Sequence, residues 1–192
     1  MRAELETARR VLSEGGVVAF PTDTVWGLLA HPGRPEAVAK VYRLKERPRK
    51  RPLQLLIPHP GRAAELAEES EGLRRLAELF WPGPLTVVVP ARRGFPELGA
   101  ERALGLRVPD HPELALLISS LGGALAATSL NKSGRPPARS RREAEAIGAD
   151  YTYPHGEPAG VASTVVDLTG PAPRVLREGA VPAAAVMEAL GL

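Results

Sequence analysis

Short apolar segments alternate with helix-forming segments along almost the whole chain, and this alternation constrains the fold more than any other feature. Runs typical of buried strands occur at residues 17–20, 53–57, 85–89, 104–108 and 124–128. Segments with apolar residues at helical spacing lie between or beside them, at residues 3–14, 35–45, 61–80 and 112–121. Such interleaving predicts an α/β or α+β fold in which helices flank one sheet.

The C-terminal part of the chain adds a predicted hairpin. Residues 163–168 and 174–177 are strand-like, flank the turn sequence TGPAP, and are expected to pair. A short helix is expected at 140–147 and a last one at 183–190. Because the spacing of elements is irregular, a mixed sheet is predicted rather than a purely parallel one. Loops rich in proline and glycine follow the strands, which is where open α/β sheets commonly bind ligands.

Length and composition limit the class of protein. A chain of 192 residues, 44% of them hydrophobic, predicts a single domain over residues 1–192 with its own core. No apolar run reaches the ~18 residues of a membrane span, and the N-terminus lacks the apolar segment of a secretory signal. The chain has no cysteine, which excludes disulfides and thiolate metal sites. We therefore expect a cytoplasmic protein with no membrane association.

Lysine and amide side chains are rare in this chain. Of the 25 basic residues only four are lysines, and Asn131 and Gln54 are the only asparagine and glutamine. The net charge of +3 is too small to indicate a nucleic-acid binder by itself. An arginine cluster is thus weak support for a site here, whereas a lysine or an asparagine in a loop is stronger support.

Two polar loops are candidates for binding an anion. The segment KERPRKRP (45–52) would bring Lys45, Arg47 and Arg51 to one side if it is extended, and such cations suit phosphate. A solvated loop or an RNA contact are the alternatives. In TSLNKSGRPPAR (128–139), hydroxyls, backbone N–H groups and guanidinium can surround an anion, and Asn131 suits a nucleotide. Its alternative is an ordinary turn with a left-handed asparagine.

A third polar segment, PTDTVWG (21–27), follows a buried strand. Its hydroxyls and carboxylate can hold a polar ligand. The alternative is a turn in which Asp23 and Thr24 satisfy their own backbone. Among nucleotide and hydrolase motifs, the chain lacks a P-loop, a G-x-G-x-x-G after a strand and a G-x-S-x-G elbow. Its four histidines are scattered without zinc spacing, so no metal ligands are assigned.

Seven short motifs, in order along the chain, resemble the YrdC/Sua5 family, the threonylcarbamoyl-adenylate synthases. The motifs are PTDTVWGL (21–28), K-x-R-P with PL (45–53), WPGPLT (81–86), LGLRVPDHP (104–112), S-x-N-x-S-G (129–134), STVVD (163–167) and LREG (176–179). The resemblance implies a twisted, open, mixed sheet with flanking helices around a large basic cavity. It also implies that L-threonine, bicarbonate and ATP, the last as its Mg²⁺ complex, give L-threonylcarbamoyl-AMP and pyrophosphate.

The resemblance also implies partners beyond the three substrates. Other proteins would transfer the threonylcarbamoyl group to the tRNA adenosine next to the anticodon, and tRNA or other RNA could bind directly. The sequence shows no dedicated pair of carboxylates for magnesium, and Asp23 and Asp167 are the individual candidates.

Family roles carry over residue by residue. The catalytic tetrad falls on Lys45, Arg47, Ser129 and Asn131. The threonine-binding residues would be Thr24, Pro109, Ser129 and Ser163. The nucleotide-binding residues would be Lys45, Arg47, Arg51, Asn131, Arg139 and Arg177. Arg107–Pro109 would line the pocket.

The chain departs from the family pattern at three positions. Trp26 stands where many relatives have tyrosine, and we expect it to keep an aromatic wall. Leu130 replaces the small middle residue of the S-x-N motif. Leu56 occupies a position where some relatives have a histidine, so a histidine contact to threonine is missing. No extra C-terminal domain of the kind found in longer relatives is expected.

Two other functions compete with the enzyme. One is a binding module whose basic cavity holds structured RNA without catalysis. The other is the related cavity inside larger carbamoyltransferases, which carry zinc-binding modules. The absence of cysteine argues against the second.

Overall fold

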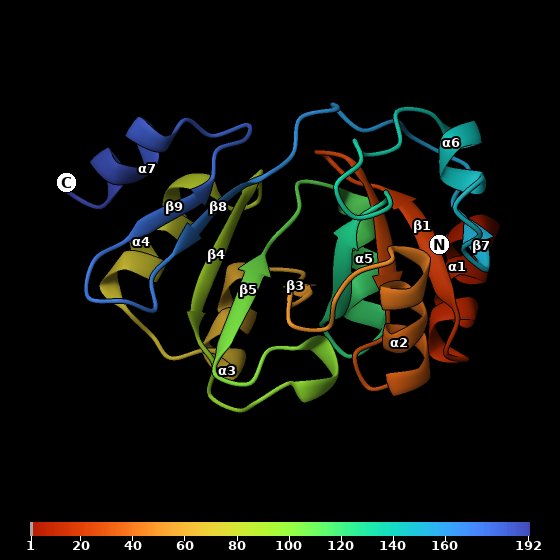
Figure 1. Cartoon of the computed structure of the whole chain (residues 1–192), viewed down its shortest axis with the longest axis horizontal. Helices are drawn as coiled ribbons and strands as arrows, with labels where there is room; N and C mark the ends of the chain where they lie inside the picture. Colours follow the sequence, from red (N-terminus) through yellow and green to blue (C-terminus); the bar gives the residue numbers. More distant parts are fainter. Residues whose placement is uncertain (1) are drawn as a thin grey trace.

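One mixed sheet runs through residues 2–192, the part of the chain that this computed structural model describes (Figure 1). Its strands are β1 (Val17–Pro21), β2 (Trp26–Ala30), β3 (Gln54–Leu56), β4 (Leu85–Pro90), β5 (Ala103–Arg107), β6 (Leu125–Ser129), β7 (Tyr151–Thr152), β8 (Thr164–Asp167) and β9 (Arg174–Arg177). They lie in the order β7-β1-β2-β6-β3-β5-β4-β8-β9. The pairs β1/β7, β3/β5 and β4/β8 are parallel and the others antiparallel, which confirms the predicted mixed sheet.

Helices pack against this sheet at both ends (Figure 1). They are α1 (Ala3–Ser13), α2 (Pro35–Leu44), α3 (Ala63–Leu66), α4 (Glu71–Phe80), α5 (Pro112–Ser120), α6 (Arg141–Glu145) and α7 (Ala183–Ala189), with 3₁₀ turns at Pro60–Arg62 and Pro96–Leu98. Helix α4 begins where the Ser70 hydroxyl accepts the N–H of Leu73, as an N-cap does. Helix α1 ends before Gly15, which has the positive φ of 89° that only glycine adopts easily.

Two strands were not predicted. Strand β2 is buried along its whole length, so it lacks the alternation that marks a half-buried strand. Strand β7 has only two residues and pairs with β1 from a distant part of the sequence. The predicted hairpin of β8 and β9 is confirmed.

Successive side chains along a strand point to opposite faces of the sheet, so one face contributes to a core and the other to a cavity. In β5, Leu104 and Leu106 join one apolar core with residues of α2 and α4, whereas Gly105 and Arg107 line a cavity on the other face. A second core, which includes Leu12 of α1 and other residues of α1 and α5, covers the end of the sheet formed by β1, β2 and β6. The cavity therefore occupies the part of the sheet that α1 and α5 leave open.

None of the helices in residues 2–192 is both long enough and apolar enough to cross a bilayer.

Candidate active site

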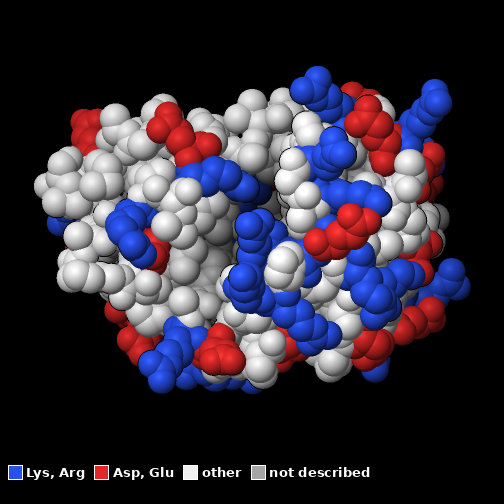
Figure 2. Space-filling model, viewed as in Figure 1, with Lys and Arg blue, Asp and Glu red and all other residues white. Residues whose placement is uncertain are grey.

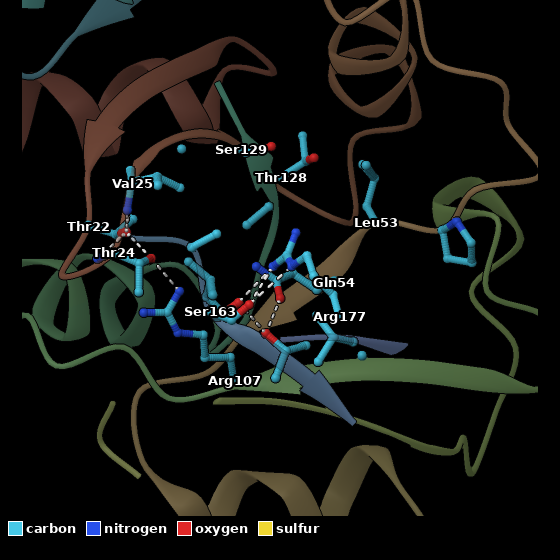
Figure 3. Close-up of a pocket in the computed structure, with 18 of the residues that line it drawn as sticks. Thr22, Thr24, Val25, Leu53, Gln54, Arg107, Thr128, Ser129, Ser163 and Arg177 are labelled. Carbon is cyan, nitrogen blue, oxygen red and sulfur yellow. Dashed lines mark hydrogen bonds between the residues drawn. The ribbon is translucent and has the colours of Figure 1, made fainter. Parts of the chain in front are cut away.

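A cavity of about 370 Å³ lies over the middle of the sheet, and this volume falls in the range of small-molecule sites. Residues from seven strands line it, together with the loop between β1 and β2 (Figure 3). Figure 2 shows the hollow in the centre of this face with lysine and arginine side chains along its rim. Its polar lining consists of Thr22, Thr24, Arg47, Gln54, Thr86, Arg107, Thr128, Ser129, Ser163 and Arg177.

The loop between β1 and β2 holds Thr24 in a fixed orientation. The Thr22 hydroxyl donates to the Val25 carbonyl at 2.7 Å, which uses its only proton. Thr24 Oγ1, 2.9 Å from Thr22 Oγ1, must therefore be the donor in that contact. Thr24 Oγ1 also accepts a hydrogen bond from Arg107 Nη1 at 2.8 Å. One lone pair of Thr24 Oγ1 therefore remains to accept a hydrogen bond from a ligand.

Arg107 supports this loop from the neighbouring half of the sheet. It is 3% exposed; Nη2 forms an ion pair with Asp23 Oδ1 at 2.6 Å, and Nε donates to the Gly83 carbonyl at 2.9 Å. Burial lowers the pKa of Arg107 and the charge of Asp23 opposes this. The turn interpretation of this segment was therefore partly wrong: Thr22 closes the turn, whereas Asp23 and Thr24 bind an arginine distant in sequence.

Lys45 is buried beneath the S-x-N loop. Its ammonium donates to Ser129 O at 2.5 Å, Asn131 Oδ1 at 2.7 Å and Asn131 O at 3.0 Å, which uses all three protons. Burial, and next the charge of Arg47, lower the pKa of Lys45 to about 7, while the three oxygens favour the ammonium form. Among residues 2–192, neither Lys45 nor Asn131 lines the cavity, but together they fix Ser129, which does.

The basic loop after α2 is not extended, because Glu46 has a φ of +51°. Lys45 consequently points to the S-x-N loop, while Arg47 turns to the cavity and donates to the carbonyls of Arg51 and Pro52 at 3.0 and 2.9 Å. Arg47 Nη1 has no acceptor within residues 2–192. Of the other sequence-predicted site residues, Arg51 and Arg139 are exposed, Pro109 is buried, and none of the three lines the cavity.

Ser163, which directly precedes β8, and Arg177 of β9 line the cavity. Arg177 Nη2 donates to the Ser163 carbonyl at 2.7 Å and to its hydroxyl at 3.2 Å. Burial lowers the pKa of both Arg177 and Arg47, and the charge of Arg177 is one of the weaker causes at Arg47. Both remain cations, since arginine is not deprotonated in proteins.

Two polar residues of the cavity lining that hydrogen-bond to each other, Gln54 and Thr86, were given no site role from the sequence. The side chain of Gln54 in β3 accepts from the Thr86 hydroxyl at 2.8 Å (Figure 3). The signal was present, because a single glutamine in an amide-poor chain is as unusual as its single asparagine.

The structure shows where the three residues that depart from the family pattern lie. Trp26 is 1% exposed within the core and does not line the cavity, so the expected aromatic wall is wrong. Leu130 is fully buried in the same core, and its N–H donates to the Trp26 carbonyl at 2.7 Å. Leu56 lines the cavity as an apolar residue.

The described residues do not fit a resident metal ion. No group of three or more metal-ligating side chains occurs in residues 2–192. Asp23 is paired with Arg107, and Asp167 is held by Arg174 and Thr169.

Comparisons with known proteins identify a family model and named relatives that match this chain. A family model for Sua5/YciO/YrdC proteins, described as "Telomere recombination", matches residues 10–179. A Halorhodospira halophila protein named threonylcarbamoyl-AMP synthase is 42% identical over 135 residues, which cover 69% of this chain and 71% of that protein.

Two solved structures share the fold. The crystal structure of Pyrococcus abyssi Sua5 complexed with L-threonine superposes with a TM-score of 0.90 at 34% identity, covering 97% of this chain and 57% of that one. This chain thus spans little more than half of the Pyrococcus protein. Escherichia coli YciO superposes with a TM-score of 0.86 at 23% identity over 95% of this chain and 92% of that one, a likeness of fold alone.

Proposed function

The chain belongs to the Sua5/YciO/YrdC family, and we propose that it is a threonylcarbamoyl-AMP synthase acting in the cytoplasm. The observation that carries the proposal is a cavity with cationic donors on one wall and an acceptor, Thr24, on another, in a chain whose relatives bear that name. A substrate that combines anionic groups with an amine or a hydroxyl fits both walls.

The proposed reaction joins three substrates. The threonine amine adds to the carbon of bicarbonate, or of the CO₂ derived from it, to give a carbamate, and bicarbonate releases one water in this step. A carbamate oxygen then attacks the α-phosphorus of ATP, and the bond to pyrophosphate breaks. The product is L-threonylcarbamoyl-AMP. Positioning and electrostatic stabilisation supply most of the catalysis in such transfers.

The nucleotide wall of the proposed site contains Arg47 and Arg177, and Ser129 in the cavity lining is kept as a threonine contact. Arg47 and Arg177 line the cavity as cations, and the partial burial of Arg47 strengthens its interaction with phosphate oxygens, whereas Arg177 is more exposed. Lys45 and Asn131 act through Ser129, whose position they fix. Arg51 and Arg139 are proposed as further nucleotide contacts, made from loops that approach the bound nucleotide.

The threonine wall of the proposed site contains Thr24 and Ser163. The remaining lone pair of Thr24 Oγ1 suits the amine or the hydroxyl of threonine. Support comes from the Pyrococcus protein, which was solved in complex with L-threonine and has the same fold. Pro109 is buried outside the cavity lining, so its proposed role is to support the site rather than to touch threonine.

Further participants remain part of the proposal. Magnesium would arrive as the counter-ion of ATP, and no step is assigned to it because no set of side chains among residues 2–192 fits a resident ion. Other proteins would pass the threonylcarbamoyl group to tRNA. The non-catalytic RNA-binding alternative is less well supported, because the relatives are named as enzymes.

An amino-acid panel tests the proposed function. The purified chain is incubated with ATP, Mg²⁺, bicarbonate and one amino acid at a time, and pyrophosphate is measured. We expect release with L-threonine to exceed that with serine or valine, since serine lacks the methyl group and valine lacks the hydroxyl group. Steeply salt-dependent RNA binding with no pyrophosphate release would favour the binding module instead.

Arg47→Ala is expected to raise the KM for ATP ~10- to 100-fold and to change the KM for threonine much less. The substitution removes a cation that faces the cavity, and a charged hydrogen bond contributes about 1.5–3 kcal/mol. Steady-state kinetics with each substrate varied in turn measures the effect. Arg49→Ala is the matched control, because Arg49 lies on the same loop, is exposed and does not line the cavity. Equal effects of the two substitutions would remove Arg47 from the nucleotide wall.

A further inference from the structure

A chain of hydrogen bonds crosses the floor of the cavity from β9 to β3 (Figure 3). Arg177 Nη2 lies 3.2 Å from Ser163 Oγ, Ser163 Oγ lies 3.0 Å from Thr86 Oγ1, and Thr86 Oγ1 lies 2.8 Å from Gln54 Oε1. Ser163 and Thr86 are 4% and 3% exposed, so water does not replace these bonds.

The direction of these hydrogen bonds follows from the groups at the two ends, since a guanidinium can only donate and the amide oxygen of Gln54 can only accept. Arginine can only donate, so Ser163 Oγ accepts from Arg177. The single proton of Thr86 is given to Gln54 Oε1, and therefore Ser163 must donate to Thr86. The hydroxyls of Ser163 and Thr86 therefore each accept one hydrogen bond and donate one.

This series of hydrogen bonds fixes the orientation of the Gln54 amide at its end. Because Oε1 is held by Thr86, the NH₂ group is the part of the amide that is left for a ligand. Gln54 lines the cavity, and its Nε2 has no acceptor among residues 2–192.

The surroundings of this NH₂ group point to an anionic oxygen. Arg177 uses Nε and Nη2 on Ser163, and Arg47 uses Nε and Nη2 on backbone carbonyls, which leaves Nη1 of each arginine without an acceptor in residues 2–192. Both arginines line the same cavity as Gln54. Asp23, the carboxylate next to Thr24 in sequence, is already paired with Arg107.

We infer that Gln54 is a substrate-binding residue whose side-chain NH₂ donates to an oxyanion oxygen of the reacting groups, and that Thr86 and Ser163 position it. The inference rests on the proposed function and names a residue in the same site. The oxygen belongs either to the α-phosphate of ATP or to the carbamate group formed on the threonine amine. Both are anionic oxygens that accept an N–H. Kinetics with each substrate varied separately distinguishes the two sources.

Two substitutions of Gln54 test the inference. Gln54→Met keeps the length of the side chain and removes its donors, so the KM for the substrate bearing that oxygen should rise ~10- to 100-fold. Gln54→Glu keeps an acceptor for Thr86 and places a negative charge where a donor stood, so its effect should be larger than that of Gln54→Met. A rise in the KM for ATP assigns the phosphate oxygen, and a rise for threonine and bicarbonate assigns the carbamate.

The positioning role of Thr86 has its own readout. Thr86→Val should raise the same KM as Gln54→Met, should add nothing in the Gln54→Met background, and should be largely rescued by Thr86→Ser. Thr169→Val is the matched control, because it removes a threonine hydroxyl that is bonded to Asp167 away from the cavity lining. Thermal unfolding verifies that each variant is folded at the assay temperature.

The outcomes separate this inference from the proposed function. If the wild-type chain forms the adenylate but Gln54→Met and Gln54→Glu keep wild-type KM values for all three substrates, the inference is overturned. If the wild-type chain forms no adenylate, the proposed function fails, and calorimetric titration with ATP and with threonine plus bicarbonate decides the inference. Weaker binding of either by Gln54→Met supports it, whereas unchanged affinities or no binding by the wild type contradict it.

Discussion

Lys45→Met lowers the rate of adenylate formation ~100- to 1000-fold, because the S-x-N loop loses the ammonium that holds it. Lys45 is 1% exposed and binds Ser129 O, Asn131 O and Asn131 Oδ1. Its removal takes the donor from the carbonyl oxygens of Ser129 and Asn131, while Asn131 Oδ1 keeps the Ser129 hydroxyl, and each partly buried oxygen left unpaired costs about 1–3 kcal/mol. We therefore expect a lower unfolding temperature as well as a lower kcat, in contrast to a residue that only contacts substrate.

Lys132→Met is the matched control for this prediction. Lys132 lies in the same loop and pairs with Glu46 at 2.6 Å, but its side chain is 58% exposed. Exposed ion pairs contribute about 0–1 kcal/mol, so kinetics and unfolding temperature should change little. Steady-state kinetics and thermal unfolding, measured for both variants, compare their kcat values and unfolding temperatures. A Lys45→Met variant with turnover within about threefold of the wild type would show that the loop keeps its shape without the ammonium.

Arg107→Leu is expected to lower the free energy of unfolding by about 3–5 kcal/mol, because it leaves the largely buried Asp23 carboxylate without its partner. It also removes the donor to Thr24 and so loosens the turn on the threonine wall. Urea unfolding measures the change: the midpoint should fall while the slope m stays constant. The double variant Asp23→Leu with Arg107→Leu should recover part of the loss, since no charge is then left unpaired.

Arg174→Leu provides the comparison for Arg107→Leu. Arg174 also pairs with an aspartate, Asp167, but its side chain is 69% exposed, against 3% for Arg107. Loss of this surface pair should cost no more than about 1 kcal/mol. If Arg107→Leu cost no more than Arg174→Leu, the Arg107–Asp23 pair would not stabilise the β1–β2 loop in the way described.

The fold was predictable from the sequence where apolar periodicity and turn residues agreed. Helix α2 begins at Pro35 as predicted, and the β8–β9 hairpin forms around its glycine- and proline-containing turn. Strand order was not predictable, because the pairing of β3 with β5 and β6 joins segments far apart in the sequence. Such pairing depends on how faces pack, and one sequence does not display it.

The site was predictable at the level of segments rather than side-chain directions. Lys45 and Asn131 were expected to meet, and Nζ lies 2.7 Å from Oδ1. The sequence did not reveal that Glu46 has a positive φ, which separates Lys45 from Arg47 and sends only Arg47 to the cavity. Gln54 and Thr86 were missed because they line the cavity from within strands, where polar residues are easily taken for strand surface.

The cavity is proposed to join an amino-acid carbamate to a nucleotide. Incubation of the chain with ATP, Mg²⁺, L-threonine and ¹³C-bicarbonate, followed by mass spectrometry, is the decisive experiment. The account predicts an adenylate that carries one ¹³C atom in its carbamoyl group and forms in equal amount to pyrophosphate. A threonyl adenylate without the label, or ATP left intact in the presence of all three substrates, would contradict it.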